Sequence, residues 1–463
     1  MGSTGVPLAV HGDRATDCTT KLDSGMQKLQ SLLVLAYAIS LPLSMTASWA
    51  ILTTGLIAYA VQVAVIAKRR LSANAESETV EDAHDSSTTV QPKDAGSAYP
   101  LAPAIAVFAL IVAISGLFNG GAGEAWRSVW SLKAILCYFW ASFVFWRDRE
   151  LAIQCVQALL TVGALAGIWG TIQQVFNYHP FGYRYLQGTG FLGGPMAFAG
   201  QMQIVSMVAV AIVISGAYSS FKFKMNNKWV FLAIALANVL GLIFAGERSA
   251  WLGGLAGSLA IASLFSFRLL VKAAVGLALV GIISWFTVPL VHTRVESMLS
   301  GKQDVSTRVR YQVWNQALAS WHESPVVGIG FLKFPHLDIP EAIVPGKSKD
   351  INHAHSNYLQ MLSTTGVLGL LAYVGLCLST LFFARRQFLS GKASNDPLLI
   401  GFGSGLLGAM VSLMVAGIFE YNFGTAQVRL VQWFVLGFLS MSRPRPVQEQ
   451  IPEVVVHSRD QSS

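Results

Sequence analysis

Charged residues are scarce in this chain. Of its 463 residues only 12% are Asp, Glu, Lys or Arg, whereas 53% are hydrophobic. A soluble domain carries about 25% charged residues, so the composition excludes an ordinary soluble protein and predicts an integral membrane protein. The net charge is +8, but no stripe of Lys and Arg with interleaved aromatic residues is present, which argues against a nucleic-acid partner.

The usual residues of metal and nucleotide sites are also missing. The four cysteines are spread over the polar N-terminus and three hydrophobic segments, which excludes a disulfide framework and a metal knuckle. The chain lacks a His/Cys ligand set, a Gly-rich nucleotide loop and an outward-facing Asp-x-Asp pair, so we expect no metal ion and no cofactor. The acids at the expected outer side are scattered along the sequence: Glu124, Glu247, Glu296, Asp338, Glu341 and Glu420.

Long hydrophobic runs dominate what is present. A bilayer core of about 30 Å needs roughly 20 apolar residues as helix, and this length predicts an all-α polytopic fold with about twelve transmembrane helices. The first hydrophobic segment begins only after the polar leader 1–28 and is followed by no small-residue cleavage site, so we expect a retained first span with an N-terminal tail. The expected spans are 29–46, 48–67, 100–118, 129–146, 151–172, 193–215, 230–246, 250–267, 270–290, 355–383, 398–418 and 426–442.

Basic residues at every second loop set the expected orientation. Clusters of Lys and Arg mark the cytoplasmic side of inner-membrane proteins, and an even number of spans puts both termini, 1–28 and 443–463, on that side. This predicts a bacterial inner-membrane protein. The clusters are Lys68 to Arg70, Arg147 and Arg149, Lys222, Lys224 and Lys228, Arg268 and Lys272, Arg385 and Arg386, and Arg443 and Arg445.

Three segments are not expected to span. Residues 71–98 have the composition of a disordered cytoplasmic linker within the region 29–290, which holds the first nine spans. Residues 173–192 form an outer loop. Residues 291–354 form a large periplasmic loop before the last three spans, in 355–442. Apolar residues at helical spacing within this large loop predict an amphipathic helix over 306–322.

A second set of cations lies at the opposite, outer ends of the spans. Taken alone, each of these cations has a structural explanation: it lies at a helix end, where it pairs with a nearby acid or extends toward lipid head groups. An arginine in the bilayer core costs roughly 2.5–3.5 kcal/mol, however, so several at one face indicate a bound anion, and arginine binds phosphate through bidentate hydrogen bonds. The candidate phosphate ligands are Arg184, Arg248, Arg308, Arg310 and Lys133.

The candidate proton acceptor is His355, at the start of the tenth expected span and close to a second histidine. With an unperturbed pKa near 6.5, a histidine can accept a proton from a hydroxyl near neutral pH. A lone interfacial histidine is more often without such a role. Of the two arginines in the amphipathic helix, Arg310 falls on the apolar stripe and Arg308 on the opposite face, and the choice between them stays open.

These residues resemble the O-antigen ligase family. His355-Ser356, nine further residues and then Gly366-Val367-Leu368-Gly369 match the ligase pattern H-[NSQ]-x9-G-x-x-G. Looser similarities accompany this match. They are Arg310 with Trp314 before Ser324-Pro325 and Gly328-Ile329-Gly330, Arg248 to Leu252 at a span end, and Arg184 with Gly188, Gly190, Phe191 and Pro195.

The resemblance implies a metal-independent, inverting glycosyltransferase of the GT-C type with a periplasmic active site. It would transfer O-antigen polysaccharide from undecaprenyl diphosphate to a sugar hydroxyl of the lipid A–core. In this reading His355 activates the acceptor hydroxyl. Arg184, Arg248 and Arg310 hold the diphosphate, while Lys133 and Arg308 rank second. The alternatives are a protein O-oligosaccharyltransferase or an O-antigen polymerase of the same superfamily and, more remotely, a twelve-span transporter or lipid flippase.

Overall fold

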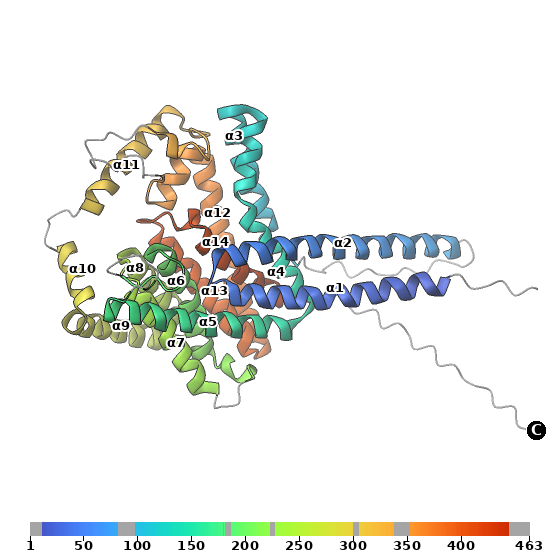
Figure 1. The fold of residues 1–463 in the computed structure, drawn as a ribbon, viewed down its shortest axis with the longest axis horizontal. Coiled ribbons are helices and arrows are strands. Elements are labelled where there is room, and N and C mark those ends of the chain that lie inside the picture. Colours follow the sequence, from blue (N-terminus) through green and yellow to red (C-terminus); the bar gives the residue numbers. More distant parts are fainter. Residues whose placement is uncertain are drawn as a thin grey trace, which may run out of the picture.

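The computed structural model describes residues 12–81, 98–178, 180, 187–222, 227–299, 305–337 and 352–443, and these residues form helices and turns without a strand. The α-helices are α1 (Gly12–Ser40), α2 (Met45–Glu81), α3 (Ala102–Ser131), α4 (Leu136–Arg147), α5 (Arg149–Phe176), α6 (Pro195–Ser215), α7 (Asn227–Phe244), α8 (Arg248–Phe265), α9 (Phe267–Thr287), α10 (Pro289–Leu299), α11 (Val305–Glu323), α12 (Asn357–Ser394), α13 (Pro397–Ala416) and α14 (Ala426–Leu436). Figure 1 shows α1 and α2 side by side, extending past the other helices.

The described residues include eight helices that are long and apolar enough to cross a membrane: α2, α3, α5, α6, α7, α9, α12 and α13. The expected all-helical, multi-pass architecture is thus confirmed, whereas the count of twelve spans is not. The expected span 426–442 contains only the 11 residues of α14 followed by a 3-10 helix. At about 1.5 Å per residue, α14 is roughly half as long as a bilayer core is thick.

Helix lengths differ from the sequence prediction at the N-terminal side. α1 begins at Gly12, inside the expected polar tail, and α2 continues to Glu81, so part of the expected linker 71–98 is helical. Beyond Gly55 no Gly or Pro interrupts α2, so nothing in its backbone ends the helix where it would leave a bilayer. Residues 82–97 of that linker lie outside the described residues.

Glycines reverse or break two of the long helices. In α3 the chain turns at Gly120 and Gly121, where φ of Gly121 is +73°. A Cβ on Gly116 would lie 2.7 Å from the Cα of Ala125, so the two parts of α3 pack closely on each other. In α12 the break is at Gly366, whose φ is +67°. Left-handed backbone of this kind strongly favours glycine.

The core lies around α6 and α13, whose apolar windows are buried inside the protein. α13 packs on α6, α8 and α12. Small residues permit this close approach, because a Cβ on Gly257 of α8 would meet α13 at Gly408 and Ser412. In contrast, α9 packs mainly on α8 and α10 and buries none of its residues, so it forms an edge of the bundle.

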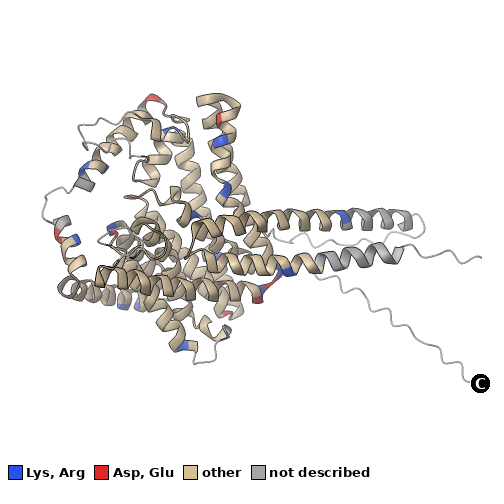
Figure 2. Ribbon diagram, viewed as in Figure 1, with Lys and Arg blue, Asp and Glu red and all other residues tan. Residues whose placement is uncertain are grey.

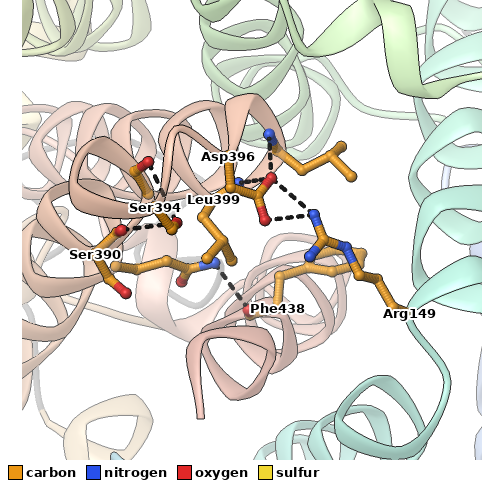
Figure 3. Close-up of polar contacts among 9 residues, drawn as sticks. Arg149, Ser390, Ser394, Asp396, Leu399 and Phe438 are labelled. Atoms are coloured by element: carbon orange, nitrogen blue, oxygen red, sulfur yellow. Dashed lines mark hydrogen bonds and ion pairs between the residues drawn. The ribbon is translucent and has the colours of Figure 1, made fainter. Parts of the chain in front are cut away.

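Charged residues are sparse along the helices (Figure 2). One ion pair connects α5 to the turn between α12 and α13. The carboxylate of Asp396 accepts hydrogen bonds of 2.7 and 2.6 Å from Nη2 of Arg149, at the start of α5 (Figure 3). Asp396 also caps α13, accepting from the backbone N–H of Leu398 and Leu399. The candidate site lies at the other end of α13.

Candidate active site

His355 lies in the turn immediately before α12. Its φ is +48°, a left-handed conformation that is uncommon for a residue with a Cβ. The turn is held from both sides: Gln360 Oε1 accepts the backbone N–H of Ala354 at 2.7 Å, and Ser356 caps the helix by accepting from the N–H of Leu359. Strained backbone of this kind persists where the surroundings over-determine it, often at functional sites.

Asn357 joins this turn to the segment that follows α13. Its backbone N–H donates to the carbonyl of Gly417 at 2.7 Å, and its side chain donates to Asn422 Oδ1 and accepts the N–H of Phe423. Asn357 is completely buried. The hydrogen bonds fix the chain on both sides of Glu420, so the start of α12 and the end of α13 hold His355 and Glu420 in one place.

α11, which covers the predicted helix 306–322, supplies Arg310. The buried side chains of Val313 and Ala317 pack with Ala354 of the His355 turn. The chain after α11 then crosses α12 at its break: Ile329 and Gly330 donate to the carbonyls of residues 363 and 364, and residues 367 and 368 donate to those of 325 and 326. A Cβ on Gly366 would collide with the crossing backbone, so the glycine of the H-[NSQ]-x9-G-x-x-G pattern permits this crossing.

These elements place an imidazole, a carboxylate and a guanidinium together. Nδ1 of His355 lies 3.6 Å from Oε1 of Glu420, and Nη2 of Arg310 lies 3.6 Å from Oε2 of the same carboxylate. The side chains are only 21%, 11% and 16% exposed for His355, Glu420 and Arg310. Burial alone would raise the pKa of Glu420, but the neighbouring His355, then His353 and Arg310, hold this pKa below its ordinary value.

His353 lies beside His355, and the centroids of the two imidazole rings are 4.3 Å apart. Its Nδ1 accepts the backbone N–H of His355 at 3.2 Å, so Nδ1 carries no proton. Burial, and next the charge of His355, lower the pKa of His353 to about 4, so this ring is neutral near pH 7. Because Nδ1 of His355 faces Glu420, its Nε2 is the nitrogen available to accept a proton from a substrate.

A second carboxyl lies close by. Glu247, at the start of α8, and Glu420 line one small pocket of about 10 Å³. Burial, and next the charge of Glu420, raise the pKa of Glu247 to about 7, against the opposing charges of Arg294, Arg310 and Arg248. Arg248 therefore belongs to the same electrostatic neighbourhood as Arg310 and Glu420.

Arg248 also lines an apolar groove. The groove has a volume of about 340 Å³ and is lined by α7, α8, α9 and α10, with Trp251, Leu255, Leu277 and Val280 among its walls. Among the described residues of that lining, Arg248 alone is charged. A long apolar chain with an anionic head group fits such a groove, because the chain would replace water on its walls and the guanidinium would meet the charge.

The histidines and Glu420 also have the geometry of a metal site. Within the described part of the chain, His353, His355 and Glu420 offer one ligand atom each, all within 4.8 Å of one another. Arg310 already places a fixed positive charge against this carboxylate. A divalent cation would therefore compete with the guanidinium of Arg310 for the carboxylate of Glu420. The arrangement fits proton transfer better than metal binding.

Two predicted phosphate ligands, Lys133 and Arg308, are not placed with this group. Lys133 lies over the indole rings of Trp49 and Trp130, 5.3 and 5.7 Å from their centroids. Arg308 is exposed, whereas the Arg310 side chain is largely buried and paired with Glu420. Arg184 falls outside the described residues.

Sequence reasoning missed four contributors: His353, Arg294, Glu247 and Glu420. The two glutamates lie far apart in the sequence, but the fold brings them to one pocket. One signal was present in the sequence. Glu420 follows the eleventh expected span and His355 opens the tenth, so both were expected at the same membrane face.

The O-antigen ligase family model matches residues 230–374. A comparison with curated proteins gave no match. The matched segment begins in α7, ends in α12 and contains Glu247, Arg248, Arg310 and His355. Residues 230–374 of this chain are therefore similar to the O-antigen ligase family.

Proposed function

We propose that this protein is an O-antigen ligase, a GT-C-type glycosyltransferase of the bacterial inner membrane whose site faces the periplasm. It transfers O-antigen polysaccharide from undecaprenyl diphosphate to a sugar hydroxyl of the lipid A–core, without a metal ion. The observation that carries the proposal is the grouping of His355, Glu420 and Arg310, next to Arg248 in the wall of an apolar groove.

The acceptor is activated at His355. Nε2 of His355 takes the proton of the acceptor hydroxyl while the hydroxyl oxygen forms a bond to the anomeric carbon of the donor sugar. Glu420, held ionised, stabilises the imidazolium that results and keeps the ring oriented. Because the nucleophile enters opposite the leaving group, the configuration at the anomeric carbon inverts.

The leaving group is the polyprenyl diphosphate. As the bond from the anomeric carbon to the phosphate oxygen breaks, its electron pair goes to that oxygen, and the guanidinium groups of Arg248 and Arg310 stabilise the added charge. Arg184 is proposed to hold the diphosphate with them, and Arg308 and Lys133 are second-rank candidates for phosphate contact. Groups fixed in advance toward developing charge contribute several kcal/mol to such reactions. The polyprenyl chain lies in the groove between α7, α8 and α9.

The test uses purified protein with an undecaprenyl-diphosphate-linked glycan and, in parallel, rough lipopolysaccharide or a pilin-like protein as acceptor. Wild-type protein should glycosylate the lipopolysaccharide in the presence of EDTA, and His355→Ala should lose transfer. The matched control, His322→Ala, removes an exposed histidine of α11 and should keep it.

Each outcome either identifies the acceptor or contradicts one part of the proposed mechanism. Transfer to the protein acceptor alone would make the enzyme a protein O-oligosaccharyltransferase, and extension of the donor glycan itself would make it a polymerase. Activity that disappears with EDTA and returns with a divalent cation would overturn the metal-free mechanism. Unchanged transfer by His355→Ala would remove this residue from the chemistry.

A further inference from the structure

Glu247 occupies the N-cap position of α8 but does not cap the helix. Its φ and ψ are −93° and 112°, the extended conformation of an N-cap residue, yet its side chain accepts no hydrogen bond from the helix. An acidic side chain at this position is ordinarily stabilised by the helix N–H groups and dipole. The carboxyl of Glu247 instead lines the pocket that it shares with Glu420.

Charges from four elements act on this carboxyl. Arg248 of α8, Arg294 of α10 and Arg310 of α11 favour its ionised form, whereas Glu420, after α13, and burial favour its neutral form. α6 also borders the pocket, and the residues that it contributes are uncharged: Met196, Ala199, Gly200 and Gln203. Burial and the charge of Glu420 outweigh the three arginines, since the pKa of Glu247 is raised to about 7.

A diphosphate changes this balance. The arginines that favour ionisation of Glu247 include the two proposed to receive the donor diphosphate, Arg248 and Arg310. An anion bound to them offsets their positive field at Glu247 and adds negative charge close to a carboxyl that is already beside Glu420. A carboxyl whose surroundings become more negative binds a proton more tightly.

We propose that Glu247 takes up a proton from solvent when the donor diphosphate binds Arg248 and Arg310, so that donor binding is coupled to protonation of this carboxyl. The inference rests on the proposed function. The neutral carboxyl then no longer repels the diphosphate and offers its O–H as a hydrogen-bond donor. Glu420 keeps its charge beside His355 and Arg310, so the two carboxyls of one pocket have different tasks.

The sign of the pH dependence follows from linkage. Below pH 7 Glu247 is already protonated in the empty site, and donor affinity does not depend on it. Above pH 7 each binding event must also capture a proton, so affinity falls by up to about tenfold per pH unit. For one group with a pKa of about 7, the dissociation constant should rise about tenfold between pH ~6 and pH ~8.

The experiment measures binding of a polyprenyl diphosphoryl monosaccharide to the full-length protein in lipid nanodiscs from pH ~6 to ~8. Both phosphates of this probe are esterified, so its own charge is constant over the range. Glu247→Gln resembles the protonated acid. It should bind as wild type does at pH ~6, bind more tightly than wild type at pH ~8, and show a correspondingly smaller pH dependence.

Two further variants sharpen the result. Glu247→Asp keeps a titratable carboxyl and should keep a pH dependence. Glu124→Gln removes a carboxylate paired with Arg127 on α3 and should follow the wild-type curve. Calorimetry in buffers of different ionisation enthalpy should show proton uptake on binding near pH ~8 for wild type, and less for Glu247→Gln.

The outcomes separate this inference from the proposed function. If wild type and Glu247→Gln bind the probe with the same pH dependence, the coupling is wrong while the donor site stands. If Glu247→Gln binds more weakly at every pH, the site needs Glu247 as an anion, and the coupling is again wrong. If wild type does not bind the probe at all, the proposed donor site fails and the inference fails with it.

Discussion

Glu420→Gln tests the arrangement most directly. The substitution keeps the shape of the side chain and removes the charge that faces His355 and Arg310. Two unit charges 3.6 Å apart attract by about 4–5 kcal/mol at an effective dielectric constant near 20. His355 is 21% exposed, and solvent screens part of this attraction. We therefore expect the transition state to lose about 2–3 kcal/mol, which lowers kcat roughly 30- to 160-fold.

The assay is transfer of the lipid-linked glycan to lipopolysaccharide, followed over a range of pH with the donor saturating. Because the imidazolium that forms in the reaction loses its counter-ion, kcat should fall over the whole pH range tested. The matched control is Glu296→Gln. Glu296 also lies 3.6 Å from a histidine nitrogen, that of His292, but both side chains are about half exposed or more, so its removal should change kcat less than twofold.

Folding is checked separately from activity. Glu420→Gln must elute as a monodisperse protein and keep a cooperative melting transition in detergent. If a folded Glu420→Gln protein retains more than half of the wild-type kcat, Glu420 does not support His355 in the reaction. The proposal that the carboxylate of Glu420 stabilises the imidazolium of His355 would then be wrong, even if His355 itself proved essential.

Two further predictions concern stability, and thermal unfolding in detergent measures both. Gly366→Ala should destabilise the protein by at least about 2 kcal/mol, because a left-handed residue with a Cβ costs about 1–2 kcal/mol and the new Cβ would collide with the crossing backbone. The control Gly375→Ala, where a Cβ meets open space in α12, should be neutral or stabilising, and equal effects would contradict the crossing. Asp396→Asn keeps the cap of α13 but loses its ion pair with Arg149, which should cost about 1–3 kcal/mol. Glu150→Gln, which removes only an exposed pair, should cost less than about 0.5 kcal/mol, and a loss as large as that of Asp396→Asn would show that burial of the pair is unimportant.

The sequence predicted the membrane class and most helices because these depend on local patterns. Runs of about 20 apolar residues account for α5, α6, α7, α9 and α13, whose bounds lie within a few residues of the expected spans. The predicted helix 306–322 lies within α11 because apolar residues at helical spacing are also a local pattern. The count of twelve spans is not confirmed, since α14 has only 11 residues and hydropathy does not fix where a helix ends.

The sequence by itself determined several residues of the site: a histidine and two glycines at the spacing of the ligase pattern, and an arginine on the apolar stripe of α11. Only the tertiary structure decided which carboxylates join them. Glu420 reaches His355 because Asn357 ties the start of α12 to the chain beyond α13, and Glu247 reaches the same pocket from α8. Such pairings depend on how helices pack through space, and no local pattern of hydrophobicity or spacing encodes them.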